Sequence, residues 1–173
     1  MSILEKFKSI RTFVFDVDGV MTDGSVQLYE TGEQVRRMNT RDGYSLQLAI
    51  RKGYRILVIS GALSEGVRQR LHYLGIEDIF LDIHDKVAVL RQYAKDHGLE
   101  TGDMLYMGDD IPDYLPMQFV GLACAPADAA PEIRHIAAYI SSFNGGQGCV
   151  RDVIEKVLKL NGHWDLNTTV ASK

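Results

Sequence analysis

Thr12-Phe13-Val14-Phe15-Asp16-Val17-Asp18-Gly19 is the stretch that decides the fold. Its run of β-branched and aromatic residues predicts a buried parallel strand, and two carboxylates follow at the carboxyl end of that strand. The carboxyl ends of strands are where α/β sheets bind their ligands. Two carboxylates packed together repel each other, and a divalent cation bound through oxygen relieves the repulsion most simply. Mg²⁺ suits such a sparse site, which water and phosphate complete.

Length and composition favour one globular domain that binds a small ligand. At 173 residues and 46% hydrophobic, the chain is long enough to bury a sizeable core, and we assign the domain to residues 1–161. Residues 162–173 lack periodicity, and we expect a mobile tail there. The formal net charge of −4 offers no basic surface for nucleic acid. We also expect no membrane partner and a cytoplasmic location, because the sequence has neither a signal peptide nor a transmembrane run.

Strand-like and helix-like segments alternate along the chain. This alternation is typical of a Rossmann-like parallel sheet with helices on both faces. After the first strand, we predict strands at 54–59, 78–81, 104–107, 120–124 and 138–140, and helices at 41–52, 64–74, 85–97, near Pro131 and at 149–160. Ser64 is a suitable N-terminal cap for the second of these helices, and Gly75 would end it.

A β-hairpin is predicted between the first strand and the first of these helices. Residues 26–30 and 34–38 alternate in polarity on either side of Thr31-Gly32-Glu33, so a flap should span about 24–39. This flap and one helix fill the chain from Asp16 to Ser60, while two helices and a strand fill it from Ser60 to Asp109. The sequence therefore leaves no room for an inserted cap domain.

Polar side chains gather at the ends of four predicted elements. They are Asp16 with Asp18, then Ser60 with Gly61, then Lys86, and finally Asp109 with Asp110 and Asp113. Phosphoryl transfer through an aspartyl-phosphate requires such a set. Asp16 would attack phosphorus, and Asp18 would protonate the leaving oxygen and then activate water. Ser60 and Lys86 would hold the phosphoryl oxygens.

These residues carry a family resemblance. Asp16-Val17-Asp18-Gly19, Ser60, Lys86 and Gly108-Asp109-Asp110-Ile111-Pro112-Asp113 resemble, in this order, the four motifs of the haloacid dehalogenase-like phosphohydrolases. Within that superfamily, residues 16–24, 41–44, 108–113 and 145–152 resemble the phosphatases of 3-deoxy-D-manno-octulosonate 8-phosphate (KDO 8-phosphate). Phosphatases of nine-carbon keto sugar acids share these segments. The resemblance implies a Mg²⁺-dependent enzyme of lipopolysaccharide sugar biosynthesis that acts on a phosphorylated keto sugar acid.

The resemblance also implies roles around the metal ion. Asp16 and Asp109 would bind it through their side chains, and Asp18 through its backbone carbonyl. Asp113 would support Lys86 or the metal site without binding the ion. Asp110 could support the metal site in the same way, or it could only cap the helix that follows it.

Closure of the site and recognition of the sugar are expected to need a second chain. The resembling enzymes are homotetramers in which a neighbour's hairpin and glycine-rich C-terminal segment cover each site. The predicted substrate contacts are Gly61, Arg41, Arg68, Arg70, Gly146 and Arg151, the last two from the glycine-rich segment, which could also be only a flexible entry to the last helix. Ala62 and Leu63 stand where the family often has basic residues. Because Ala62 provides no acidic group for a longer polar chain, the eight-carbon acid is favoured.

Two functions of other classes remain as alternatives. A receiver-like signalling domain also surrounds a phospho-aspartate with acidic residues, a hydroxyl and a lysine, but it needs no acid two residues beyond the phosphorylated aspartate. Asp18 occupies that position here, which favours turnover over storage of the phosphoryl group. The intact acidic set likewise argues against a non-catalytic partner of a sugar-activating enzyme.

Overall fold

The opening segment forms a central strand of a six-stranded sheet. The computed structural model describes residues 2–166 and 169–170. The strands of this sheet are β1 (Thr12–Phe15), β4 (Arg55–Ile59), β5 (Asp78–Phe80), β6 (Met104–Met107), β7 (Leu122–Ala125) and β8 (Tyr139–Ile140). Every neighbouring pair is parallel, in the spatial order β5-β4-β1-β6-β7-β8. The predicted Rossmann-like sheet is confirmed.

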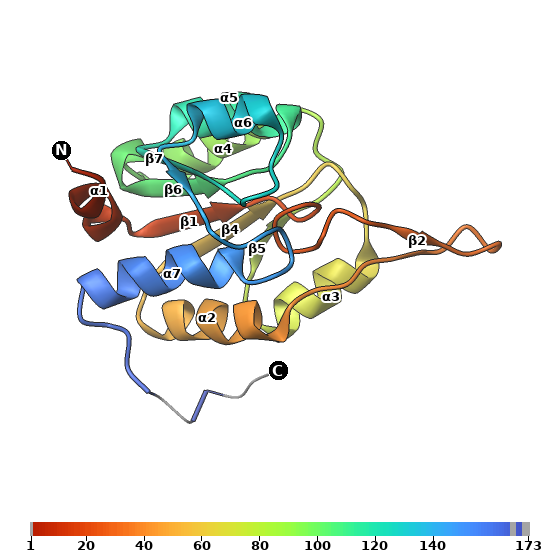
Figure 1. Cartoon of the computed structure of the whole chain (residues 1–173), viewed down its shortest axis with the longest axis horizontal. Coiled ribbons are helices and arrows are strands. Elements are labelled where there is room, and N and C mark those ends of the chain that lie inside the picture. The colour runs from red at the N-terminus through yellow and green to blue at the C-terminus, as the bar shows by residue number, and fades with distance from the viewer. Residues whose placement is uncertain (1, 167–168, 171–173) are drawn as a thin grey trace.

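Helices cover both faces of the sheet, as Figure 1 shows. They are α1 (Ile3–Ser9), α2 (Thr40–Arg51), α3 (Glu65–Tyr73), α4 (Lys86–Asp96), α5 (Tyr114–Phe119), α6 (Pro131–Ile136) and α7 (Cys149–Leu160). The 3₁₀ turns η1 (Thr101–Asp103) and η2 (Ile111–Asp113) precede β6 and α5. Helices α4, α5 and α6 lie on one face, and α2, α3 and α7 lie on the other, where α1 contacts α7.

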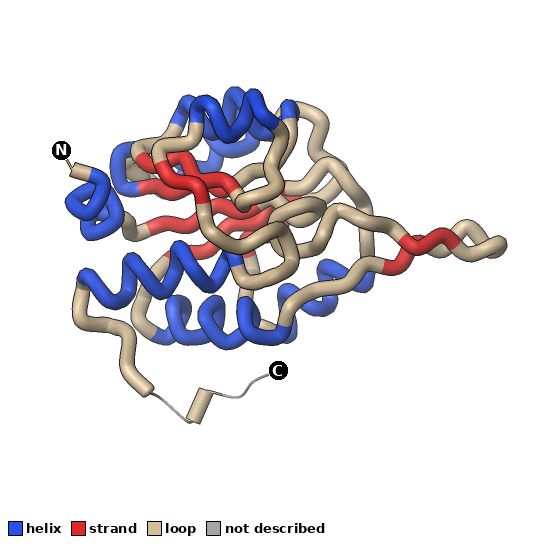
Figure 2. The backbone as a smooth tube through the Cα atoms, viewed as in Figure 1, coloured by secondary structure: helices blue, strands red, loops and turns tan. Residues whose placement is uncertain are grey.

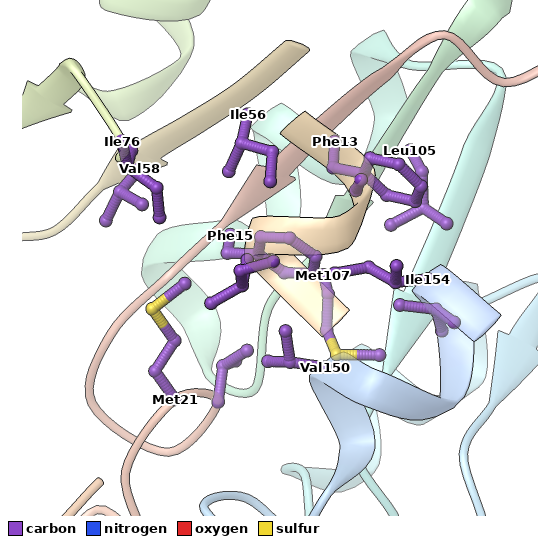
Figure 3. Close-up of a cluster of buried hydrophobic side chains, with 14 of the residues drawn as sticks. Phe13, Phe15, Met21, Ile56, Val58, Ile76, Leu105, Met107, Val150 and Ile154 are labelled. Atoms are coloured by element: carbon purple, nitrogen blue, oxygen red, sulfur yellow. The ribbon is translucent and has the colours of Figure 1, made fainter. Parts of the chain in front are cut away.

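Alternation along the strands divides the core into two layers. Phe13 and Phe15 of β1 pack on the side of α2, α3 and α7, whereas Val14 packs on the side of α4 and α6. Figure 3 shows the first layer, to which α7 contributes Val150 and Ile154. Burying a side chain of this kind contributes roughly 1.5 to 3 kcal/mol. The strands are therefore held from both faces, and because neighbouring strands are all parallel, their carboxyl ends lie at the same edge of the sheet.

Local caps place the helices that follow the strands. The Ser64 hydroxyl accepts the backbone N–H of Val67 at 3.4 Å and starts α3 as predicted. Gly75 has φ +90° just beyond the end of this helix, a conformation that suits glycine. The Asp85 carboxylate accepts the N–H of Ala88 at 3.0 Å and starts α4, so that Lys86 lies in its first turn.

The hairpin projects away from the body of the protein (Figures 1 and 2). It consists of β2 (Gln27–Leu28) and β3 (Gln34–Val35), which pair antiparallel. Both strands are shorter than the predicted 26–30 and 34–38, because no layer of the described chain packs on this projecting ribbon and all four paired residues are exposed. The prediction of a hairpin is confirmed, and its length is corrected.

Between β1 and β4 the described chain contains the hairpin and α2, and between β4 and β6 it contains α3, β5, α4 and η1. No cap domain is present in this described part. No helix within residues 2–166 and 169–170 is long and apolar enough to cross a membrane.

The start of the predicted tail lies against the body of the protein. The Tyr54 hydroxyl hydrogen-bonds His163 Nδ1 at 2.9 Å, and Trp164 contacts the ring of Tyr44 edge to face. Residues 167–168 and 171–173 of the tail lie outside the described residues. The mobility of 162–173 and the domain boundary at 161 stay predictions.

Candidate active site

The carboxyl ends of three adjacent strands bring the predicted catalytic residues together. Asp16 follows β1, Ser60 follows β4, and Asp109 follows β6 after one glycine. Because β1 lies between β4 and β6, these three strand ends are neighbours. A cavity of about 400 Å³ opens there, lined by Asp16, Asp18, Gly24, Ser60, Gly61, Ala62, Ile83, His84, Lys86, Asp109, Asp110, Pro112 and Asp113.

Asp16 is held firmly beside a buried ammonium group. Its backbone N–H donates to the carbonyl of Met107 at 3.1 Å, which joins the end of β1 to the end of β6. Lys86 Nζ lies 3.0 Å from Asp16 Oδ1, and both side chains are almost completely buried. The ammonium group therefore offsets part of the negative charge of Asp16 without solvent between them.

Asp113 fixes the position of this ammonium. One of its carboxylate oxygens lies 2.8 Å from Lys86 Nζ and also accepts the Tyr106 hydroxyl at 2.7 Å. The other oxygen accepts the backbone N–H of Asp109 at 3.1 Å. Both oxygens are thus occupied by protein donors. This geometry is the one expected of a supporting residue.

Glycines allow the acidic residues to approach one another. Gly19 has φ +82°, and a Cβ on it would stand 2.0 Å from Asp109 Oδ2. A Cβ on Gly108 would stand 2.3 Å from Asp113 Cβ. Any larger residue at either position would displace a carboxylate of the site.

Electrostatics show what this cluster lacks. Burial, followed by repulsion from Asp113, raises the pKa of Asp16 to about 8 despite the nearby Lys86. Burial, followed by repulsion from Asp113 and Asp110, raises the pKa of Asp109 to about 7. Burial lowers the pKa of Lys86, but the carboxylates of Asp113 and Asp16 outweigh it and the net shift is upward. One ammonium group does not balance the carboxylates around it.

A divalent metal site fits this imbalance. Oxygen atoms of Asp16, Asp109 and Asp113 lie within 4.8 Å of one another, a spacing that a single cation can bridge. Carboxylate oxygen is the ligand that Mg²⁺ and similar hard cations prefer. The Asp18 side chain does not join this group, and a metal contact through its backbone carbonyl stays a prediction.

Asp18 instead pairs with an arginine of the hairpin. Arg36 Nε lies 2.7 Å from Asp18 Oδ1, and Arg36 Nη2 donates to Asp18 Oδ2 at 3.1 Å. Arg36 was not predicted as a site residue. The hairpin was predicted, but no local pattern indicates that the residue just after β3 contacts the loop that follows β1, residues 16–24, which we call the catalytic loop.

Asp110 and the predicted arginines occupy other places. Asp110 is exposed and accepts the backbone N–H of Ile111 at 2.8 Å, so it caps η2 at the rim of the cavity. Arg68 pairs with Glu65 at 3.7 Å on α3. Arg70 lines a second cavity of about 770 Å³ between the hairpin and α3, and Arg41 and Arg151 line a third of about 440 Å³ beside α7. None of the four arginines lines the catalytic cavity of its own chain as described, so their contacts with substrate stay predictions.

The glycine-rich segment packs against the catalytic loop of its own chain. A Cβ on Gly145 would stand 2.0 Å from the carbonyl oxygen of Gly19, and one on Gly146 would stand 2.6 Å from the N–H nitrogen of Asp23. Gly146 also donates its N–H to the carbonyl of Val20 at 2.9 Å. These contacts give the glycines a structural function within one chain. The sequence had suggested only a substrate contact or a flexible entry to the last helix.

The start of α7 already holds a carboxylate. Asp42 Oδ1 accepts the backbone N–H of Arg151 at 2.9 Å, while the other Asp42 oxygen is buried without a partner. Burial raises the pKa of Asp42 to about 6, although the N–H of Arg151 opposes this shift. The anion that sequence analysis expected at this helix end would therefore lie against a buried acidic group. Residues 41–44 carry part of the family resemblance, but the cap that Asp42 forms was not predicted from the sequence.

Comparisons with known proteins agree with the fold and with the family resemblance. No protein-family model matches the chain. The 3-deoxy-D-manno-octulosonate 8-phosphate phosphatase KdsC of Escherichia coli (strain K12) is 31% identical over 163 residues, which cover 94% of this chain and 87% of the relative. The crystal structure of the phosphatase of the same name from Yersinia pestis superposes with a TM-score of 0.91 at 30% identity, covering 93% of this chain and 87% of that one. The Moraxella catarrhalis phosphatase, crystallised with magnesium, phosphate and KDO, gives a TM-score of 0.88 at 32% identity and covers 91% of each chain.

Proposed function

The chain belongs to the family of 3-deoxy-D-manno-octulosonate 8-phosphate phosphatases, and on that premise we propose that it hydrolyses KDO 8-phosphate to KDO and inorganic phosphate. One observation carries the proposal: the buried Asp16 and the partly buried Asp109 lie together beside Lys86, at the strand ends where a phosphoryl group can reach all three. The haloacid dehalogenase-like motifs and the parallel sheet support the same activity.

The reaction that we propose runs through a phosphorylated Asp16. A carboxylate oxygen of Asp16 attacks phosphorus, and the bond between phosphorus and the leaving sugar oxygen breaks. Asp18 gives its proton to that oxygen. In the second step Asp18 takes a proton from water, which attacks phosphorus and releases phosphate from Asp16.

Other residues position the phosphoryl group and offset its charge. Ser60 donates its hydroxyl to one phosphoryl oxygen, and Lys86, held in place by Asp113, donates to another. Asp16 and Asp109, with the backbone carbonyl of Asp18, would hold a divalent ion that we propose to be Mg²⁺. When bound, this ion neutralises charge between the Asp16 carboxylate and the phosphoryl oxygens.

The eight-carbon acid is the substrate that we favour. Ala62 lines the catalytic cavity beside Gly61 and offers no acidic group to bind the hydroxyls of a longer chain. The test is a steady-state comparison of KDO 8-phosphate, nine-carbon keto sugar acid 9-phosphates and simple sugar phosphates. We expect the highest kcat/KM for KDO 8-phosphate. A higher kcat/KM for a nine-carbon substrate would reassign the substrate, and turnover of none of them would remove the proposal.

We further propose that the working enzyme is a homotetramer. The hairpin projects from the body and exposes Leu28 and Tyr29, so a neighbouring chain could bury them. The catalytic cavity of one chain contains none of the arginines predicted to bind the sugar carboxylate. Sedimentation at the concentration of the kinetic assay tests this proposal, because a fully active monomer would contradict it.

A further inference from the structure

The ion pair between Arg36 and Asp18 differs from an ordinary surface ion pair in its two-point geometry and in the burial of Arg36. Two nitrogens of one guanidinium bind the two oxygens of one carboxylate, at 2.7 Å and 3.1 Å. The Arg36 side chain is only 6% exposed, although the residue belongs to a hairpin that otherwise faces solvent. Such a bidentate, charge-assisted contact fixes the orientation of both groups. The hairpin thereby holds the carboxylate that the proposed reaction uses for proton transfer.

The third nitrogen of Arg36 has no acceptor. Nη1 is buried and forms no hydrogen bond with any described residue. A buried guanidinium donor without an acceptor is unfavourable, and such a group in a native structure calls for a partner. Arg36 also lines the cavity of about 770 Å³ between the hairpin and α3, which Arg70 lines too. Arg36 therefore contacts Asp18 of the catalytic cavity and also lines a second cavity, and its Nη1 is a buried donor without an acceptor.

The pair conflicts with the acid step of the reaction. Asp18 must carry a proton on an oxygen that faces the leaving group. Both of its oxygens instead accept hydrogen bonds from the guanidinium, which holds the carboxylate toward the hairpin. Turning this carboxylate toward the leaving group requires that at least one of these bonds breaks. A group that arrives with the substrate can break it by competing for Arg36.

We propose that Arg36 is a specificity residue that exchanges Asp18 for the carboxylate of the substrate. In the substrate-free enzyme the guanidinium holds Asp18. The carboxylate of the keto sugar acid enters the cavity between the hairpin and α3, accepts from Nη1 and then draws the guanidinium away. Asp18 is released toward the leaving oxygen. The inference rests on the proposed function. It links binding of the substrate carboxylate, far from the phosphoryl group, to the release of Asp18 from Arg36.

Two substrates distinguish this exchange from a structural role. KDO 8-phosphate carries the remote carboxylate, whereas 4-nitrophenyl phosphate carries only the phosphoryl group. Arg36→Gln should lower kcat/KM for KDO 8-phosphate roughly 10- to 100-fold, the effect of losing a charge-assisted contact. It should not lower kcat/KM for 4-nitrophenyl phosphate, because that ester has no carboxylate to bind and gains from a released Asp18. Arg37→Gln is the matched control, since Arg37 is the next residue of the hairpin and is exposed.

A second variant guards against misfolding. Arg36→Lys keeps the charge but lacks the planar fork, so it should recover part of the activity on KDO 8-phosphate. Equal losses of kcat/KM on both substrates would overturn the proposal, as would an unchanged kcat/KM for KDO 8-phosphate. If the unmodified enzyme hydrolyses the aryl ester but not KDO 8-phosphate, the proposed function fails. In that case the proposal that Arg36 restrains Asp18 is tested with 4-nitrophenyl phosphate alone. A lower kcat/KM of Arg36→Gln for this ester would reject it.

Discussion

Removal of divalent metal should make the stability of this protein fall as the pH rises. In the metal-free protein the pKa of Asp16 is raised to about 8 and that of Asp109 to about 7, against 3.8 for an ordinary aspartate. Between pH 4 and pH 8 the folded state therefore binds more protons than the unfolded state. Stability decreases with pH wherever the folded state holds the extra protons. The contribution of Asp16 and Asp109 to the free energy of unfolding should thus be highest near pH 4 to 5 and lowest above pH 8.

The size of the effect follows from the burial of the two carboxylates. Asp109 is partly open to solvent, so we count one extra proton rather than two across pH 5.5 to 7.5. One proton over two pH units corresponds to about 2 to 3 kcal/mol. A domain of this size loses roughly 2 to 4 °C in melting temperature for each kcal/mol. Without metal, we therefore expect the protein to melt roughly 5 to 10 °C lower at pH 7.5 than at pH 5.5.

Mg²⁺ should reverse this loss at high pH. An ion that binds only the folded state adds about 2.7 kcal/mol at a hundredfold excess over its Kd. Its ligands must be deprotonated, so the gain should be large at pH 7.5 and small at pH 5.5. Thermal unfolding with and without chelator at both pH values measures the four melting temperatures, and Asp16→Asn should remove most of the metal-dependent gain. A metal-free protein that is equally stable at both pH values, or a Mg²⁺ shift independent of pH, would refute the account of the site.

Four further predictions concern single residues. Asp16→Asn should abolish phosphate release while leaving the circular dichroism spectrum unchanged, because an amide cannot attack phosphorus. Asp18→Asn should lower kcat roughly 100-fold or more, because an amide cannot exchange the proton. Asp42→Ala removes the acceptor at the start of α7 and should lower the melting temperature by roughly 2 to 4 °C, the effect of losing a helix cap worth about 1 kcal/mol. Arg151→Ala should lower kcat/KM for KDO 8-phosphate but not for 4-nitrophenyl phosphate if a neighbour's arginine binds the sugar carboxylate, and an equal effect on both esters would exclude that contact.

The sheet and the catalytic cluster could be predicted because their signals are local. Each core strand is a short apolar run, and the polar residue that matters follows it within a few positions, as Ser60 follows β4. A parallel sheet then brings the strand ends together without further information. Helix starts such as Ser64 were predictable for the same reason, since a capping side chain lies beside the amide it binds.

Contacts between distant segments could not be predicted in this way. Arg36 meets Asp18 across 18 positions only because the hairpin folds back over the catalytic loop. Asp42 caps α7 across 109 positions, and its own neighbourhood looks like an ordinary helix start. Helix α1 was also missed, and the helix after Asp110 was expected without bounds, because segments of 7 and 6 residues are too short to show a helical period.

The charges buried in the site are the reason to expect that this phosphatase needs both Lys86 and a metal ion. Asp16, Asp109 and Asp113 face one ammonium, that of Lys86, so three negative groups meet one positive group when all are ionised. Without a further cation, the three carboxylates would repel one another and would also repel a phosphate dianion, because little solvent screens charges at these distances. A dication would cancel the remaining negative charge and make the same set neutral toward the substrate. Asp113, whose oxygens are fully engaged, keeps Lys86 in place when the phosphoryl group competes for it. Lys86 thus offsets charge in the folded protein before substrate binds, and a bound metal ion would make the site able to accept an anion.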